Sequence, residues 1–145
     1  AKSGGPPKIK KMPKGEHGDS VKRGVEVYNT LCITCHLADG KGAENLAPPL
    51  ANSDWVAGSQ ERLIRIALHG VQGPIKVNGN RYRHPEVMPG IGAALKDQQV
   101  ADVLSYVRTA WGGKSQVKLK DVSRVRDEHK GRVLPWEVKD LLKID

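Results

Sequence analysis

The sequence predicts a mainly helical single domain, an all-α fold with one minor β-hairpin and an extension at each end. Apolar residues recur at helical spacing in three separate segments, and Gly- and Pro-rich stretches lie between those segments. A chain of 145 residues suffices for one such domain with tails. Aromatic residues make up only 4% and Phe is absent, so a bound group is a candidate source of further apolar mass.

Residues 1–19 are expected to form a basic flexible arm. They contain four Gly and three Pro and few apolar residues, so they lack the means to form a core. Residues 1–23 carry seven basic against two acidic side chains, residues 24–111 are balanced, and the net charge of the chain is +8. The lysines have no interleaved aromatics that could stack on bases. The charge therefore favours an acidic partner or an anionic membrane surface and argues against nucleic acid.

The composition also excludes other classes. No window approaches 18 consecutive apolar residues, so no membrane-spanning helix is expected. Two cysteines are too few for a disulfide-rich scaffold. The chain begins at Ala1 rather than Met, which fits a processed or a trimmed product and leaves removal of an export segment open.

The first helix is expected to begin near Ser20, a favourable N-cap residue. Gly24 lies beside its apolar face, where glycine indicates close approach of a second helix. The apolar face consists of Val21, Val25, Tyr28 and Cys32.

After a loop over residues 38–51, the next helix is predicted from Ser59 to His69, with Gly70 closing it. Asn78-Gly79 between two short apolar-alternating runs predicts a hairpin with a type I′ turn. Residues 85–92 are expected to be a loop. A third helix is predicted over 97–111, ended by Gly112-Gly113.

Residues 113–145 are expected to form a C-terminal helical extension that packs against the domain. One helix is predicted over 121–130, stopped by Gly131. Another is predicted from Pro135, a residue suited to the first helical position, to about Lys143.

The motif that carries chemistry is Cys32-Ile33-Thr34-Cys35-His36, which uses both cysteines of the chain. Cys-x-x-Cys-His is the attachment signal of c-type haem. Two thiols three residues apart can each bond one vinyl group of the same porphyrin, and the adjacent His then lies where it can ligate the iron.

Three alternatives compete for this motif. A redox-active dithiol needs a βαβ context, which the flanking sequence lacks. A structural zinc site needs four ligands, and no His pair has zinc-finger spacing. A plain disulfide would leave His36 unexplained.

The stretch from about Gly24 to Gly112 resembles a class I (mitochondrial-type) cytochrome c. Gly24 and Tyr28 stand eight and four residues before Cys32, as in that family. Val103 and Tyr106 look like the aliphatic–aromatic pair of its last helix, and Pro48-Pro49-Leu50 stands where the family has Pro-x-Leu. The resemblance implies helices wrapped around one haem, covalently bound through Cys32 and Cys35, in a domain spanning 20–112.

The resemblance also implies roles for residues around the haem. The Pro48 carbonyl would accept a hydrogen bond from the ligating His36, and Leu50 would cover the ring. Trp55 and Tyr82, with Arg81, are candidates for hydrogen bonds to the haem propionates. Filling the aromatic-poor core is an equally open role for Trp55 and Tyr82.

Met88 is the predicted sixth ligand of the iron. It stands in Val87-Met88-Pro89-Gly90, where the family has its distal Met, whereas Met12 lies in the basic arm with nothing to hold it. His84 is the rival in the same loop, and two His ligands would lower the reduction potential relative to His/Met ligation.

With both axial positions filled, the protein is expected to be a one-electron carrier and not an enzyme, either as a separate carrier or as a domain or subunit of a larger redox enzyme. The alternative is a peroxidase or gas sensor whose sixth ligand leaves the iron. The strings Ser53-Asp54-Trp55 and Arg62-Leu63-Ile64 resemble bacterial haem domains of quinoprotein dehydrogenases and donors to terminal oxidases. The expected partners are redox proteins, namely such a dehydrogenase, a quinol-oxidising complex or a terminal oxidase. The protein itself is expected to be a monomer in the periplasm or another extracytoplasmic space.

Overall fold

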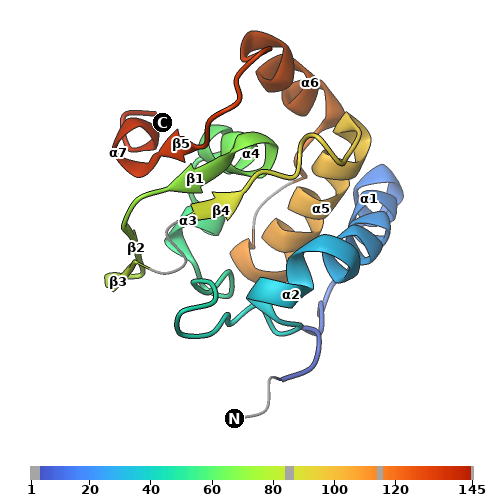
Figure 1. The fold of residues 1–145 in the computed structure, drawn as a ribbon. Helices are drawn as coiled ribbons and strands as arrows, with labels where there is room; N and C mark the ends of the chain where they lie inside the picture. The colour runs from blue at the N-terminus through green and yellow to red at the C-terminus, as the bar shows by residue number, and fades with distance from the viewer. Residues whose placement is uncertain (1–3, 84–86, 114–115, 145) are drawn as a thin grey trace.

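The computed structural model describes residues 4–83, 87–113 and 116–144, in which helices make up most of the fold and two small β-sheets lie to one side of the α1–α5 pair (Figure 1). This arrangement confirms the mainly helical fold class with minor β elements. The longer helices are α1 (Gly15–Val27), α4 (Gln60–His69), α5 (Asp97–Val107) and α6 (Leu119–Glu128). The short ones are η1 (Tyr28–Cys32), α2 (Ile33–His36), α3 (Asp54–Ala57), η2 (Arg108–Gly112) and α7 (Val138–Leu141).

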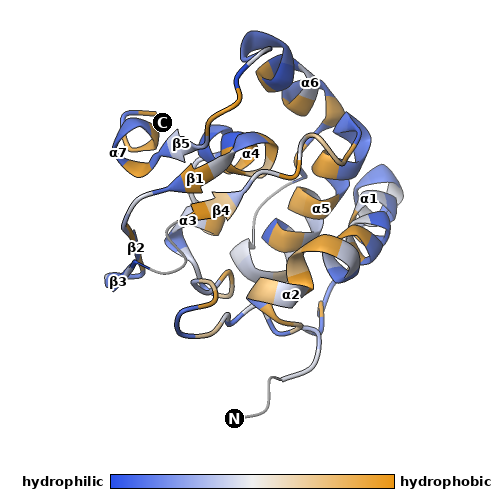
Figure 2. Ribbon diagram, in the orientation of Figure 1, coloured by the Kyte–Doolittle hydropathy of each residue, from blue (hydrophilic) through white to orange (hydrophobic). Residues whose placement is uncertain are grey.

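Helices α1 and α5 cross in close contact, and this crossing organises the core. A Cβ built on Gly24 would lie 2.0 Å from the carbonyl oxygen of Asp102 and 2.9 Å from Cβ of Tyr106. Only a residue without a side chain fits there, as the sequence predicts. Apolar faces of α5 and α2 turn toward the interior, whereas α1 and α6 are largely polar outside (Figure 2).

The prediction that α1 begins at Ser20 is wrong, because the helix begins at Gly15. Ser20 is fully buried inside the helix, and its hydroxyl donates to Oδ1 of Asp102 over 2.6 Å. The serine thus satisfies a buried carboxylate at the helix crossing instead of capping a helix end. The arm also contacts the domain: Ile9 packs against the core, and the Gly4 amide donates to Asp39 over 2.7 Å.

Two small sheets lie beside the helices. Strands β2 (Ile75–Val77) and β3 (Asn80–Tyr82) form the predicted hairpin, and both turn residues have positive φ, +51° at Asn78 and +85° at Gly79, as a type I′ turn requires. In the other sheet, β1 (Gly70–Gln72) lies between β4 (Val87–Pro89) and β5 (Trp136–Glu137). Strand β4 is antiparallel to β1, and β5 is parallel to it.

This second sheet corrects two predictions. The segment 85–92 was expected to be a loop, but Val87–Pro89 pairs with β1. Pro135 was expected to start a helix, but it precedes β5, and α7 begins only at Val138. Both strands have three residues or fewer, so their conformation comes from pairing with β1 rather than from a local sequence pattern.

The other predicted helices are present, although α6 lies two residues earlier than predicted, over Leu119–Glu128, and the short helix α3 was not predicted. Ser59 caps α4 by accepting a hydrogen bond from the Arg62 amide, and Gly70 ends that helix at φ +86°. Gly113, at φ +62°, follows the last turn of η2. In the described part of the chain, no helix has the length and apolar character needed to cross a bilayer.

Candidate functional site

A cavity bordered by α2, the 46–50 loop, α3, α4 and the two sheets brings six of the eight predicted site residues together, whereas Cys32 and Tyr82 do not line it. The space in it that water-sized molecules could occupy is about 120 Å³. Most of its lining side chains are apolar. The predicted site residues among them are Cys35, His36, Pro48, Leu50, Trp55 and Met88.

His36 ends helix α2 and is only 8% exposed. Its Nδ1 lies 3.1 Å from the Pro48 carbonyl oxygen, which can only accept, so the proton is on Nδ1. Burial lowers the pKa of His36, although the Pro48 hydrogen bond acts in the opposite direction. The imidazole is therefore neutral, and its Nε2 lone pair is available to a metal.

The backbone after His36 is fixed by its neighbours. Leu37 adopts φ +65°, a conformation unusual for a residue with a side chain. Its carbonyl accepts a hydrogen bond from the Tyr28 hydroxyl over 2.6 Å. This bond ties the end of the motif to η1 and holds the orientation of the imidazole.

Met88 reaches the same cavity from strand β4, where it pairs with Val71 of β1. Its thioether thus comes from a strand of a small sheet rather than from an unpaired loop. The competing residue His84 lies outside the described residues. Met12 is 39% exposed and does not line the cavity.

Trp55 and Tyr82 occupy different places. Trp55 lines the cavity, and its indole N–H donates to the Lys76 carbonyl over 2.8 Å, which joins α3 to the hairpin. Tyr82 does not line the cavity: it lies on β3 in a neighbouring groove together with Arg81.

The two thiols are free, with Cys32 half-buried and Cys35 exposed. Burial, aided by the nearby Cys35, raises the pKa of the Cys32 thiol to about 11. A reactive dithiol instead needs a lowered pKa. Among the residues that the structure describes, no three His, Cys, Asp or Glu side chains converge as a metal site, so the zinc alternative has no ligand set there.

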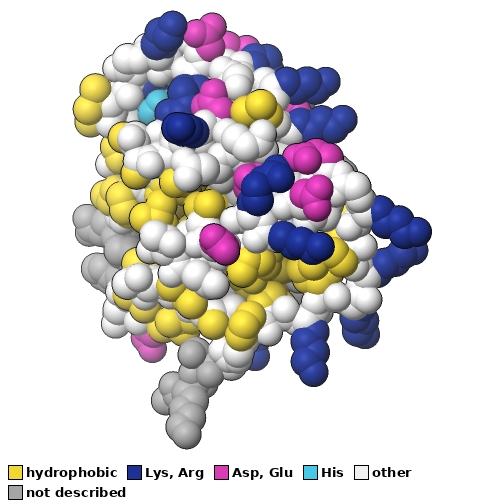
Figure 3. Space-filling view, turned by 90° about the vertical axis from the view of Figure 1, so that its right-hand side faces the viewer, with side chains coloured by type: hydrophobic (Ala, Val, Ile, Leu, Met, Phe, Trp, Pro, Cys, Tyr) yellow, Lys and Arg dark blue, Asp and Glu magenta, His cyan; other side chains and the backbone are white. Residues whose placement is uncertain are grey.

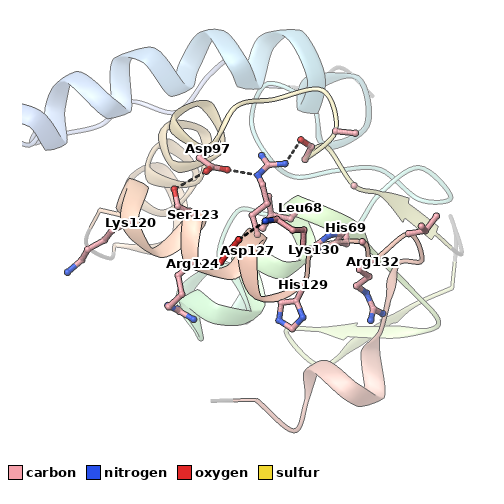
Figure 4. Close-up of a pocket in the computed structure, with 16 residues that line it drawn as sticks. Leu68, His69, Asp97, Lys120, Ser123, Arg124, Asp127, His129, Lys130 and Arg132 are labelled. Carbon is pink, nitrogen blue, oxygen red and sulfur yellow. Dashed lines mark hydrogen bonds and ion pairs between the residues drawn. The ribbon is translucent and has the colours of Figure 1, made fainter.

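Sequence reasoning missed two packing features. Tyr28, Tyr106 and Trp111 form an aromatic trio with ring centroids 5.4–5.7 Å apart behind the attachment motif. No sequence spacing signalled this trio, because Tyr28 lies on η1, far along the chain from Tyr106 and Trp111. The second missed feature is a groove between α6 and the segments around His69 and residues 90–92. Asp97, Arg124 and His129 are among the residues that line it (Figure 4).

The residues present fit a covalently bound haem. The cavity is apolar, as a porphyrin requires, and it has a cysteine of the attachment motif on its wall. A buried neutral imidazole and a thioether line the same space, and both are known axial ligands of haem iron.

These features define a protein with an apolar cavity lined by a buried imidazole, a thioether and a cysteine of a haem-attachment motif. The cytochrome c family model matches residues 21–111, and the chain belongs to the cytochrome c family. It therefore carries a covalently bound c-type haem and serves in electron transfer.

Relatives support this membership. The chain is 39% identical over 99 residues to cytochrome c-552 of Thermus thermophilus, covering 66% of this chain and 72% of that protein. It is 36% identical over 107 residues to the cytochrome c subunit of a quinone-dependent alcohol dehydrogenase of Gluconacetobacter polyoxogenes, covering 72% of this chain and 22% of the subunit. For the cytochrome c subunit of gluconate 2-dehydrogenase of Pantoea cypripedii, identity is 36% over 121 residues, covering 77% of this chain and 25% of the subunit. The chain thus spans a quarter or less of these two dehydrogenase subunits.

Proposed function

We propose that the protein is a single-electron carrier whose haem, attached through Cys32 and Cys35, has His36 and Met88 as its axial ligands. The observation that supports this assignment is that both side chains line one apolar cavity beside the attachment motif. When bound, the haem supplies reversible one-electron redox chemistry. The chain itself supplies the axial ligands, holds their orientation and excludes water from the site.

The chain positions the two donor atoms by different means. The Pro48 carbonyl holds the Nδ1 proton of His36, which directs Nε2 away from the backbone and strengthens it as a donor. Met88 offers a soft, neutral sulfur, which favours the reduced metal and raises the reduction potential. Leu50 and Trp55 contribute to the apolar wall, which excludes water, and Tyr82 borders the site from the adjoining groove.

Two protein ligands leave no vacant coordination position, so the proposal is a carrier and not an enzyme. A substrate or gas molecule could bind the metal only after one ligand had left. Ligation at Met88 is therefore what separates a carrier from the peroxidase or sensor alternative.

We propose further that a dehydrogenase, a quinol-oxidising complex or a terminal oxidase exchanges electrons with this protein outside the cytoplasm. Cytochrome subunits of dehydrogenases among the relatives support this partner class. The exposed lysines Lys8, Lys10, Lys11 and Lys14 of the arm suit an acidic partner surface. Lys and Arg side chains also project from the edges of the face shown in Figure 3. Residues 1–19, 20–112 and 113–145 are the proposed arm, haem domain and extension of a monomer.

A redox titration of the purified protein, followed by visible absorption, tests the proposal. The expected result is one haem titrating with a one-electron slope, low-spin spectra in both oxidation states and no binding of carbon monoxide at neutral pH. High-spin spectra, or ready binding of carbon monoxide by the reduced protein, would support the peroxidase or sensor alternative instead.

A further inference from the structure

The C-terminal extension packs against the elements that carry Met88. Its described residues, 116–144, lie beyond the 21–111 stretch matched by the family model. The chain passes from α6 to β5 and α7, which lie next to β1 and α4 (Figure 1). Its position raises the question of what it does for the haem site.

Strand β5 completes the sheet in which Met88 lies. Val71 of β1 pairs with Met88 on one side and with Trp136 on the other, so the three residues form one row across the sheet. The Gln72 amide also donates to Glu137 over 2.6 Å, which joins β1 to β5 a second time. Without β5, a pair of three-residue strands would remain, and an isolated two-stranded sheet is marginally stable.

The side chains of the extension also contact the wall of the cavity. Trp136 and Leu141 form a buried cluster with Ile66 of α4, and Met88 packs against this cluster. Leu141 is fully buried, and Trp136 is 8% exposed. The cluster thus supports the strand on the side of the sulfur ligand.

Arginines fix the extension to the domain at several points. Arg62 of α4 donates to the Leu141 carbonyl over 2.8 Å. The guanidinium groups of Arg65 and Arg132 lie 4.8 and 3.5 Å from the Trp136 ring centroid. Arg126 of α6 donates to the carbonyls of residues 92 and 95, just after β4. The chain just after the Met88 strand is therefore held by α6 of the extension.

We propose that the C-terminal extension is a positioning element for the sixth ligand, with Trp136 as its central residue. It holds β4 so that the Met88 sulfur stays on the metal, and it thereby sets how readily an external ligand replaces that sulfur. This inference rests on the proposed role of Met88 as ligand.

The test is the apparent affinity of the oxidised, haem-containing protein for free imidazole, measured by visible absorption. Imidazole binds only the fraction of molecules in which Met88 has left the metal, so a larger open fraction gives tighter apparent binding. Trp136→Ala is expected to tighten binding by about ten-fold, equivalent to about 1.4 kcal/mol. Trp136→Phe should stay within about three-fold of wild type, because an aromatic ring remains and the Trp136 indole nitrogen has no hydrogen-bond partner among the described residues.

Glu137→Ala is a second, milder variant, which removes the side-chain bond to Gln72 without opening a cavity. It should tighten imidazole binding by about three-fold, and it carries the test if Trp136→Ala does not fold. Val122→Ala is the matched control, because Val122 is fully buried in α6 of the same extension but belongs to the other core cluster. It should lower the stability to unfolding and leave imidazole affinity within about two-fold.

The inference is overturned if the folded Trp136→Ala and Glu137→Ala proteins bind imidazole as wild type does. It is equally overturned if Val122→Ala tightens binding as much as Trp136→Ala. Failure of the ligand assignment itself is distinguished by the wild-type spectrum: the far-red band of sulfur-ligated ferric haem would then be absent before any substitution is made.

Discussion

Gly24 gives the sharpest test of the helix crossing that supports the haem domain. Substituting alanine adds one methyl group at the contact between α1 and α5. That carbon would lie 2.0 Å from the Asp102 carbonyl oxygen and 2.6 Å from its carbonyl carbon, whereas ordinary contacts begin at 3.4 Å. The obstructing atoms are backbone, so the clash is relieved only if the helices move apart.

The magnitude follows from two opposing effects. Overpacking a tight core contact costs about 1–3 kcal/mol, and a backbone clash of this size belongs at the upper end. Replacing Gly by Ala inside a helix returns about 1 kcal/mol through helix propensity. The expected net loss in the free energy of unfolding is therefore about 2 kcal/mol for Gly24→Ala.

Guanidinium unfolding, followed by circular dichroism and by haem absorption, measures this loss. Lys22→Ala in the same helix is the control, because Lys22 is exposed and its replacement should change stability by about 0.5 kcal/mol or less. A Gly24→Ala protein as stable as wild type would refute the packing argument.

Three other substitutions test separate parts of the account. Ser59→Ala removes the cap of α4 and should lower the free energy of unfolding by about 1 kcal/mol in guanidinium titrations. Arg126→Lys removes the guanidinium that donates to the carbonyls of both Gly92 and Leu95, so it should lower the free energy of unfolding by about 1–3 kcal/mol in the same assay. An unchanged unfolding midpoint would contradict this. Burial is the main cause that lowers the pKa of His69 below its usual 6.5, and nearby arginines act in the same direction. The unfolded chain therefore binds the proton more tightly than the folded protein does, and the free energy of unfolding falls as the pH drops below 6.5. His69→Gln should reduce the loss of stability between about pH 7.5 and about pH 5.5, and an identical loss in both proteins would count against this cause.

The sequence alone predicts the parts of the site that depend on local patterns. The Cys-x-x-Cys-His motif places three groups within one turn, and Pro48 and Met88 follow from their positions relative to it in a known family. The hairpin was predictable for the same reason, because Asn78-Gly79 determines its own turn. The attachment motif and the hairpin turn each lie within a few neighbouring residues, whereas Pro48 and Met88 depend on the family resemblance.

The parts that were wrong depend on distant residues. Strand β4 forms because β1 lies beside it, and β5 forms because the extension returns to that sheet. Neither of these short runs, three and two residues long, has a pattern of its own. Ser20 has the chemistry of a helix cap, but the buried Asp102, 82 residues away, uses its hydroxyl. Trp136 gave no sign in the sequence that it would share a sheet with Met88.

The central claim is that Met88 binds the metal opposite His36, and NMR of the reduced protein labelled with ¹³C at the methionine methyl groups tests it most directly. The chain has only two methionines, Met12 and Met88, so two methyl signals are expected. A sulfur ligand lies over the porphyrin ring, whose ring current shifts the methyl signal far upfield. The account predicts one such shifted signal, lost in Met88→Leu and retained in Met12→Leu. Two signals at ordinary methionine positions in the wild-type protein would contradict it.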